Sequence, residues 1–507
     1  MVAGAARIPG AAGRQNQLIS LHRESTLPHP RSPGGPGPSL SPRERDFQRH
    51  RTAVTPLPEG EGAEPRSGEA GEGLRLQTLG HASIALYREA EAPILLTDPW
   101  LTGSCYWRSW WLQHYPSEGE LDWMSGARWV YVTHEHPDHF HMPSIRRLGT
   151  APTYLFPALS ARGYLAHMRD MGFRAEIVPA LLWQPLGGGV AMLSWPLWND
   201  DSILVIDTPS ALILNLNDAK PLPSVIRSLR RLADRAGKPR VLLASYSAAS
   251  LVNSFLDADG VVSLKRPDAY VAYLCRLCEA LGADFFLPFA SQASFERPDS
   301  AWANAYRTRF ADLERGWTAR ARLLPPYTTL DLADFGHERV PQDQYRPRAP
   351  ARLVRFTGMR ADAEAAAALD DADIARLTAK LNRWRALLRL LFPRGFSFRI
   401  GERRHYYAPG RGRIDTESSE TGDFEIAVPP LTLKEALAND HLSDLGITMV
   451  VRIRLLRRID PRKVYGLFVL FQFDDYGHLR SPRAGARWIL AGLRFSRPRR
   501  RLSRRFI

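Results

Sequence analysis

The sequence predicts a layered α/β protein, preceded by a disordered segment and followed by a separate α+β domain. Between residues 74 and 335, short apolar runs of strand character alternate with helical patterns, which is typical of sheets covered by helices. Residues 1–72 are instead rich in Pro, Gly, Arg and Ser and show no apolar periodicity. Such a segment cannot bury enough surface to offset its chain entropy, so we expect it to be disordered.

The layered region begins with strands. Leu74, Leu76 and Leu79 lead into an apolar run over residues 81–87, and a further run over 93–97 follows a polar turn, which indicates a β-hairpin. Further strands are expected at 127–133, 154–156, 190–195, 202–206, 211–216, 241–244 and 285–289, and helices at 142–148, 161–171, 224–236 and 267–281.

A change of character near Arg352 predicts the second domain. Residues 363–392 are rich in Ala, Leu and Arg and favour helix, whereas 396–400, 423–428, 447–455 and 464–474 favour strands. The run from Val464 to Phe473 is the longest apolar one, and it is shorter than the roughly 18 residues of a membrane span. The expected units are therefore residues 1–72, 73–345, 352–493 and a basic tail, 494–507.

Composition limits the class of protein and its compartment. The 507 residues are 44% hydrophobic, as in ordinary globular proteins, and three cysteines are too few for a disulfide scaffold. With no apolar N-terminal segment, a cytoplasmic location is expected. The net charge is +15, and the tail from Arg494 carries seven Arg without an acidic residue. This tail is either simply solvated or a contact for anionic lipid or nucleic acid.

The segment His-x-His-x-Asp-His is the clearest chemical signal. His134, His136, Asp138 and His139 directly follow an apolar, β-branched run and precede a helical pattern. Imidazole and carboxylate groups bind divalent first-row metals such as zinc, iron or manganese, and a loop held by a strand fixes their directions. The sequence therefore predicts a metal site on this loop.

Several segments together resemble a known superfamily. They are the His-x-His-x-Asp-His loop, His81-Ala82, Asp98-Pro99-Trp100, Ser109-Trp110-Trp111-Leu112 and Leu214-Asn215-Leu216-Asn217-Asp218. Over residues 76–335 the chain resembles the metallo-β-lactamase fold superfamily. The branch it resembles most holds ascorbate-6-phosphate lactonase, N-acylphosphatidylethanolamine phospholipase D and CMP-N-acetylneuraminate hydroxylase. The resemblance implies an αββα sandwich.

The resemblance also implies metal ligands and a reaction. His134 and His136 would belong to one metal site and Asp138 and His139 to a second, with Asp218 bridging the two. The implied activity is hydrolysis of an ester, lactone, amide or phosphoester of a small-molecule substrate by a metal-bound hydroxide. Asp138 would orient or deprotonate the attacking water.

The chain departs from the superfamily pattern at two ligands. The third His of the first site is missing near residues 197–199, and Arg297 stands where a late His is expected. One metal ion, zinc before iron or manganese, is therefore expected rather than two. We expect Arg297 to point into the pocket, where it would hold a substrate anion or pair with Asp138 or Asp218.

The two missing imidazoles leave a second function open. The chain could be a catalytically degenerate member of the superfamily that acts as a binding or scaffolding subunit. The hydroxylase relative also carries a Rieske cluster, which requires two Cys and two His. No cysteine precedes Cys105 here, so no such cluster is expected in that region, and an oxygenase working alone is not expected.

Other candidates have weaker signals. His81, Trp110 and Trp111 are expected beside the site as substrate contacts, with structural packing as the alternative for each. The Cys275 and Cys278 pair falls within one helical pattern and is expected to pack in the core. The adjacent carboxylates Asp200 and Asp201 are interpreted as turn residues.

Overall fold

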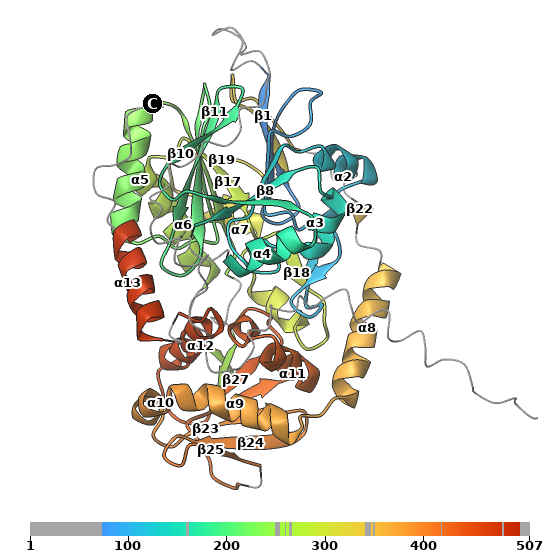
Figure 1. Cartoon of the computed structure of the whole chain (residues 1–507), viewed down its shortest axis with the longest axis vertical. Coiled ribbons are helices and arrows are strands. Elements are labelled where there is room, and N and C mark those ends of the chain that lie inside the picture. The colour runs from blue at the N-terminus through green and yellow to red at the C-terminus, as the bar shows by residue number, and fades with distance from the viewer. Residues whose placement is uncertain are drawn as a thin grey trace, which may run out of the picture.

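Two sheets pack face to face in the computed structural model, and a third sheet with its own helices lies beside them (Figure 1). Both the N-terminal segment expected to be disordered and residues 497–507 of the basic tail lie outside the described residues. The structure describes residues 73–158, 162–248, 254–258, 260–262, 266–339, 346–347, 350–416, 418–478 and 481–496.

The first sheet has eight strands and contains the expected hairpin. Its first three strands in sequence pair antiparallel, and the next three continue the sheet in parallel. Helices α2 (Glu118–Ser125), α3 (Met142–Leu148) and α4 (Arg162–Asp170) accompany it. In spatial order the strands are β21 (His337–Arg339), β20 (Thr328–Asp331), β1 (Leu74–Leu79), β2 (Ser83–Arg88), β3 (Leu95–Thr97), β7 (Trp129–Tyr131), β8 (Thr153–Pro157) and β9 (Arg174–Val178).

The second sheet has seven strands and mixes antiparallel with parallel pairing. Helices α5 (Pro223–Ala236), α6 (Pro267–Leu281) and α7 (Phe310–Gly316) pack on it. In spatial order its strands are β10 (Trp183–Gly187), β11 (Val190–Pro196), β12 (Ser202–Asp207), β13 (Leu212–Asn217), β14 (Arg240–Ser245), β17 (Phe285–Phe289) and β19 (Arg322–Leu323).

One apolar layer joins the two sheets. Leu76 and Ile84 of the first sheet share a buried cluster with Ile206, Ile213 and Leu243 of the second. Two further clusters fill the spaces between each sheet and its helices. Burial of these side chains stabilises the fold by removing apolar surface from water. The order of layers is helix, sheet, sheet, helix, so the α/β sandwich expected from the sequence is confirmed.

The third sheet belongs mostly to the C-terminal part of the chain. Helices α9 (Asp371–Arg383), α10 (Arg385–Leu391), α11 (Pro430–Ala438) and α12 (Pro461–Asp475) surround it (Figure 1). Two of its strands, Phe255–Asp257 and Gly260–Val262, come from within residues 73–345, the range expected for the first unit. The first of them pairs in parallel with the strand Arg452–Leu455. In spatial order the strands are β16 (Gly260–Val262), β15 (Phe255–Asp257), β27 (Arg452–Leu455), β26 (Phe424–Val428), β23 (Phe396–Ile400), β24 (Arg403–Ala408) and β25 (Arg413–Asp415).

The strand expected over residues 464–474 is wrong, because this segment is helix α12. Asp460 caps the helix by accepting a hydrogen bond from the Arg462 backbone N–H, and Pro461 occupies the first turn. The buried side chains Val464, Leu467, Phe468 and Phe471 recur at helical spacing. The expected strand over 447–455 is likewise shorter and begins at Arg452, after the 3-10 helix η4 (Ser443–Gly446).

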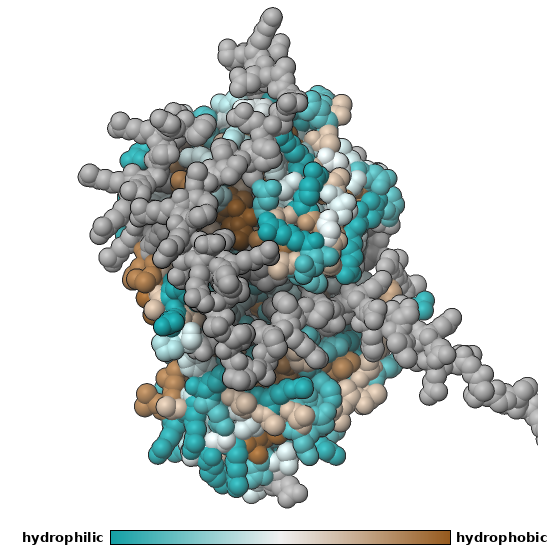
Figure 2. Space-filling view, in the orientation of Figure 1, coloured by the Kyte–Doolittle hydropathy of each residue, from teal (hydrophilic) through white to brown (hydrophobic). Residues whose placement is uncertain are grey.

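The last helix, α13 (Pro482–Ser496), returns to the sandwich beside α5 (Figure 1). It exposes Ile489, Leu490 and Leu493, and Figure 2 shows hydrophobic residues at the edge of the molecule where this helix runs. Among the helices in the described part of the chain, none combines the length and apolar character needed to span a membrane.

Candidate metal centre and its cavity

The His-x-His-x-Asp-His loop leaves the C-terminal end of β7 and is held there by Asp98, which follows the neighbouring strand β3. The Asp98 carboxylate accepts hydrogen bonds from the backbone N–H of Thr133 at 2.7 Å and from its hydroxyl at 2.9 Å. Asp98 and Thr133 are fully buried. Since both lie at the ends of adjacent parallel strands, the loop starts from a rigid position.

His139 lies at the centre of the cluster. Its Nδ1 is 3.1 Å from the carboxylate of Asp98, and its Nε2 is 3.5 Å from one carboxylate oxygen each of Asp138 and Asp218. Asp218 directly follows β13, so the second sheet brings it to the loop of the first. The expected convergence of Asp218 with the loop imidazoles is therefore present in the structure.

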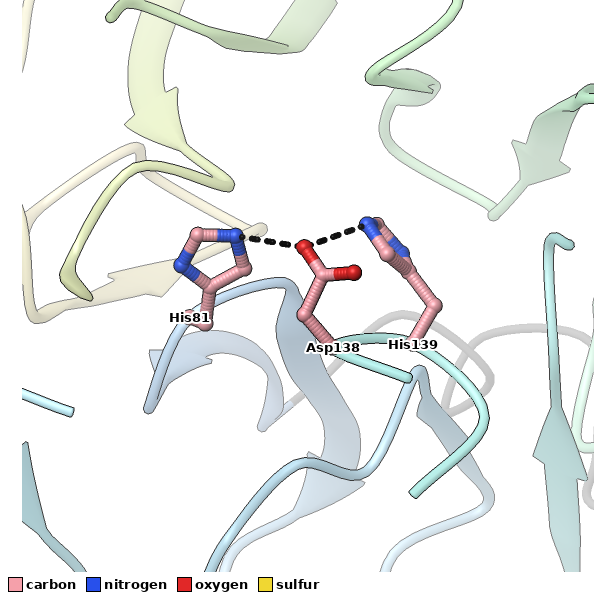
Figure 3. A group of neighbouring side chains, drawn as sticks. All are labelled: His81, Asp138 and His139. Atoms are coloured by element: carbon pink, nitrogen blue, oxygen red, sulfur yellow. Dashed lines mark ion pairs between the residues drawn. The ribbon is translucent and has the colours of Figure 1, made fainter. Parts of the chain in front are cut away.

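His81 approaches the same carboxylate from the opposite side. Its Nε2 is 3.3 Å from Asp138 Oδ2, so the two imidazoles of His81 and His139 flank this oxygen (Figure 3). The other oxygen of Asp138 accepts a hydrogen bond from the Tyr106 hydroxyl at 2.7 Å. His81 is buried, and neither of its ring nitrogens has a hydrogen-bond partner among the described residues.

His134 and His136 form the outer part of the cluster. Nε2 of His134 is 2.8 Å from Nδ1 of His136, and Nδ1 of His134 is 3.5 Å from the carboxylate of Asp201. The rings of His134 and His139 are 4.0 Å apart between centroids. Sequence reasoning assigned Asp201 to a turn and missed its place beside His134.

The charges of the cluster favour a cation at its centre. Burial opposes ionisation of Asp138 and Asp218, yet the neighbouring His139 holds the pKa of each carboxyl below its usual range. Burial likewise opposes protonation of His139, but Asp138 and Asp98 raise its pKa well above the ordinary value. Asp201 differs, because burial and the charge of Asp218 raise its pKa to about 8. Carboxylates thus surround a position that needs positive charge.

These residues fit a divalent metal ion. Two groups offer ligand atoms within 4.8 Å of one another: His81, Asp138 and His139, and His134, His139 and Asp218. His139 Nε2 is buried and has no hydrogen-bond partner in the described residues, as expected of a ligand atom whose metal would complete its contacts. Asp98 on the opposite nitrogen resembles the carboxylates that orient metal-binding histidines. His139 is the one residue that the two groups share, and an imidazole nitrogen binds one metal ion at a time, so a single ion held by one group or the other is expected.

A cavity of about 340 Å³ opens beside the cluster. The loop contributes His134 and His136 to its wall, and Asp218 and Lys220 follow from the end of β13. The C-terminal unit forms the facing wall, which the sequence did not predict. The residues from that unit are Ser443, Gly446, Ile447, Tyr465, Phe468, Val469, Gln472 and Tyr476.

Arg297 does not point into this cavity, so the expectation that it pairs with Asp138 or Asp218 is wrong. Its guanidinium is buried and binds Asp299 at 2.6 Å and Glu364 at 3.3 Å, and it also donates to Thr432. Glu364 lies in α8 (Pro350–Ala366) and Thr432 in α11. Arg297 therefore joins the sandwich to the C-terminal helices, because its charge finds carboxylates there and not at the cluster.

The remaining candidate residues differ in whether they line the cavity. Trp110 lines the cavity and donates its indole N–H to the backbone of Ile447, whereas Trp111 donates to Arg108 and does not line the cavity. Cys275 and Cys278 are buried in α6, as expected. Lys220 was missed, although it stands only two positions after Asp218, where the backbone also leaves β13.

The chain has distant sequence relatives among curated proteins. The chain is 24% identical over 296 residues to the cytidine monophosphate-N-acetylneuraminic acid hydroxylase of Danio rerio, covering 54% of this chain and 48% of the relative. It is 23% identical over 270 residues to the inactive cytidine monophosphate-N-acetylneuraminic acid hydroxylase of Homo sapiens, covering 48% and 52%. The chain thus spans about half the length of these curated relatives. No family model matches it.

The order of layers, the His-x-His-x-Asp-His loop and the names of the sequence relatives all agree with the resemblance expected from the sequence. The layers are those of the αββα sandwich that the resemblance to the metallo-β-lactamase fold superfamily implied, and both relatives carry the name of the hydroxylase in the expected branch. The expected family resemblance is thereby confirmed, while the metal-ligand roles of His134, His136, Asp138, His139 and Asp218 stay predictions.

The solved structures to which the chain is similar are more distant in sequence. A metallo hydrolase of Ignicoccus hospitalis is 12% identical, with a TM-score of 0.30, and the alignment covers 51% of this chain and 97% of that one. A possible metal-dependent hydrolase of Veillonella parvula is 11% identical, with a TM-score of 0.35, over 52% and 99%. These scores add no weight to the fold, which rests on the strand order and the sequence relatives.

Proposed function

We propose that this chain is a metal-dependent hydrolase that cleaves an ester, lactone, amide or phosphoester bond of a small molecule. The observation that carries the proposal is the orphaned Nε2 of His139, buried between the carboxylates of Asp138 and Asp218 and oriented by Asp98. A divalent metal, zinc before iron or manganese, would polarise the scissile group and lower the pKa of a water molecule toward neutrality.

The residues of the chain have separate tasks in this proposal. His139 would hold the ion, either with Asp138 and His81 or with Asp218 and His134. Asp138, kept ionised by its neighbours, would also accept the proton of the attacking water. The Tyr106 hydroxyl donates to Asp138 and so fixes the direction of its carboxylate.

A second function is favoured by a different observation. Nε2 of His134 is already paired with His136 at 2.8 Å, and the two imidazoles that complete the superfamily sites are missing. A chain with this arrangement could keep its shape and serve as a binding or scaffolding subunit without turnover. One of the sequence relatives is itself named inactive.

Hydrolysis of chromogenic esters separates the two functions. The full chain, loaded with zinc, is assayed with 4-nitrophenyl acetate and bis(4-nitrophenyl) phosphate, beside the His139→Gln variant and the chelator-treated protein. The hydrolase predicts turnover that both treatments reduce by at least about 100-fold, because ligand loss removes the charge stabilisation of the transition state. The exposed variant Asp268→Asn is the matched control and should keep full activity. Equal rates in all samples would contradict the hydrolase and leave the binding subunit.

A further inference from the structure

We propose that the cavity selects small molecules in which a carboxylate or phosphate is attached to an apolar or aromatic body. Lys220 and Ser245 would bind the anionic group, and α12 of the C-terminal unit would bind the body. The inference deepens the proposed function by naming its substrate class, and it rests on that function only for the reaction, not for the binding.

The anionic end of the cavity is built around Lys220. Its Nζ donates to the backbone oxygen of Asp218 at 2.7 Å and to the Ser245 hydroxyl at 3.2 Å, and Ser245 is 3.1 Å from the Tyr270 hydroxyl. All three side chains line the cavity, and Lys220 is exposed to it. Because an ammonium group has three N–H donors, one donor is left to bind a ligand.

Lys220 lies near the carboxylates of Asp218 and Asp201 and partly balances their charge, but it forms no direct ion pair with either of these two described residues. Its ammonium contacts the backbone carbonyl of Asp218 rather than its carboxylate, and none of the ion pairs between described residues involves this lysine. A buried lysine elsewhere is paired directly with a carboxylate, as Lys380 is with Asp475 at 2.9 Å. The remaining N–H donor of this ammonium, which faces the cavity, can bind an anion that arrives from solution.

Part of the opposite wall is apolar or aromatic. Tyr465, Phe468 and Val469 lie on one face of α12 at helical spacing, and Ile447 follows η4. Trp110 completes this surface from the sandwich side. Aromatic and aliphatic side chains of this kind bind apolar or planar groups by excluding water. The C-terminal unit therefore determines which bodies fit, while the sandwich supplies the charged groups.

Calorimetric binding of small probes tests the inference without any turnover. The full chain, at the metal content with which it is purified, is titrated with phenyl phosphate and with benzyl alcohol. Phenyl phosphate is expected to bind and benzyl alcohol is not. Lys220→Met should weaken phenyl phosphate binding by about 10- to 100-fold, the effect of losing a charged hydrogen bond. Lys220→Arg, which keeps the charge, should lose much less affinity.

The matched control is Lys463→Met, which removes an exposed lysine of α12 that does not line the cavity. This variant should bind phenyl phosphate as the unaltered chain does. Tyr465→Ala should weaken the binding of phenyl phosphate several-fold and leave the binding of inorganic phosphate unchanged. The reason is that only phenyl phosphate has an aromatic group for Tyr465 to contact.

Three outcomes would overturn the inference. They are unchanged binding by Lys220→Met, equal binding of benzyl alcohol and phenyl phosphate, or an affinity loss that a parallel loss of metal fully explains. Ser245→Ala provides a second variant in case Lys220→Met does not fold, and it too must weaken phenyl phosphate. If the chain binds phenyl phosphate through Lys220 but hydrolyses neither chromogenic ester, this inference is supported and the proposed hydrolase function is contradicted.

Discussion

Nδ1 of His139 lies 3.1 Å from the carboxylate of Asp98, and both side chains are completely buried. Asp98 also binds the backbone of Thr133, so one carboxylate fixes both the start of the metal loop and the direction of its central imidazole. The opposite nitrogen of His139 consequently faces Asp138 and Asp218 and has no hydrogen-bond partner in the described residues. The metal centre depends on this pair.

Replacing Asp98 should therefore weaken metal binding although Asp98 is not itself a proposed ligand. Asp98→Asn keeps the size of the side chain but removes the charge that orients and polarises His139. We expect zinc affinity to fall by about 10- to 100-fold, the usual effect of losing such a partner. Competition with a fluorescent zinc chelator measures the affinity. Asp268→Asn, at an exposed carboxylate, is the control, and equal affinities in both variants would show that Asp98 does not act through His139.

His81 and His141 provide a contrast between two buried histidines. His81 faces Asp138, whereas His141 caps α3 by accepting a hydrogen bond from the Ser144 backbone. His81→Gln is expected to reduce zinc affinity by about tenfold or more, because a ligand is lost. His141→Asn keeps a good helix cap and should bind zinc normally. The same chelator competition serves here, and normal binding by His81→Gln would exclude His81 as a ligand.

Replacing Arg297 should lower the free energy of unfolding and leave metal binding unchanged. Arg297→Met leaves the buried carboxylate of Glu364 with one fewer partner, although Arg360 still pairs with it, so we expect a loss of about 1–3 kcal/mol in the free energy of unfolding. Chemical denaturation measures this loss. Arg315→Met, at an exposed ion pair with Asp312, should change stability by less than about 1 kcal/mol.

Metal content gives the other half of the Arg297 test. Since Arg297 is bound to Asp299 and Glu364, both Arg297→Met and Arg297→His should leave the metal stoichiometry unchanged. A higher metal content in Arg297→His would restore the idea that this position faces the centre.

Part of this structure follows from sequence and part does not. The position of the proposed metal loop was predictable because its His and Asp residues are neighbours in the chain and follow a buried strand. The direction of Arg297 was not, because its partners Glu364 and Thr432 lie 67 and 135 positions further along the chain. The sequence pattern indicates where the backbone of Arg297 lies. Partners that are distant in the chain determine where its long side chain points.

The C-terminal unit shows a second limit. The run from Val464 to Phe473 is rich in residues that favour strands, and this composition outweighed the helical spacing of Val464, Leu467, Phe468 and Phe471 in the prediction. The facing wall of the cavity was missed with it, because α12 supplies half of the residues of that wall. Asp201 was missed for a related reason, since an adjacent pair of carboxylates is most often a turn.

The amount of metal in the purified chain tests the central claim most directly. The full chain is equilibrated with zinc, separated from unbound zinc by gel filtration and analysed by inductively coupled plasma mass spectrometry. The His139→Gln variant is treated in the same way after circular dichroism has shown that it is folded. A shared site predicts about one equivalent in the chain and less than about 0.1 in the variant. Absence of metal from both proteins, or equal metal in the two, would contradict a centre built on His139.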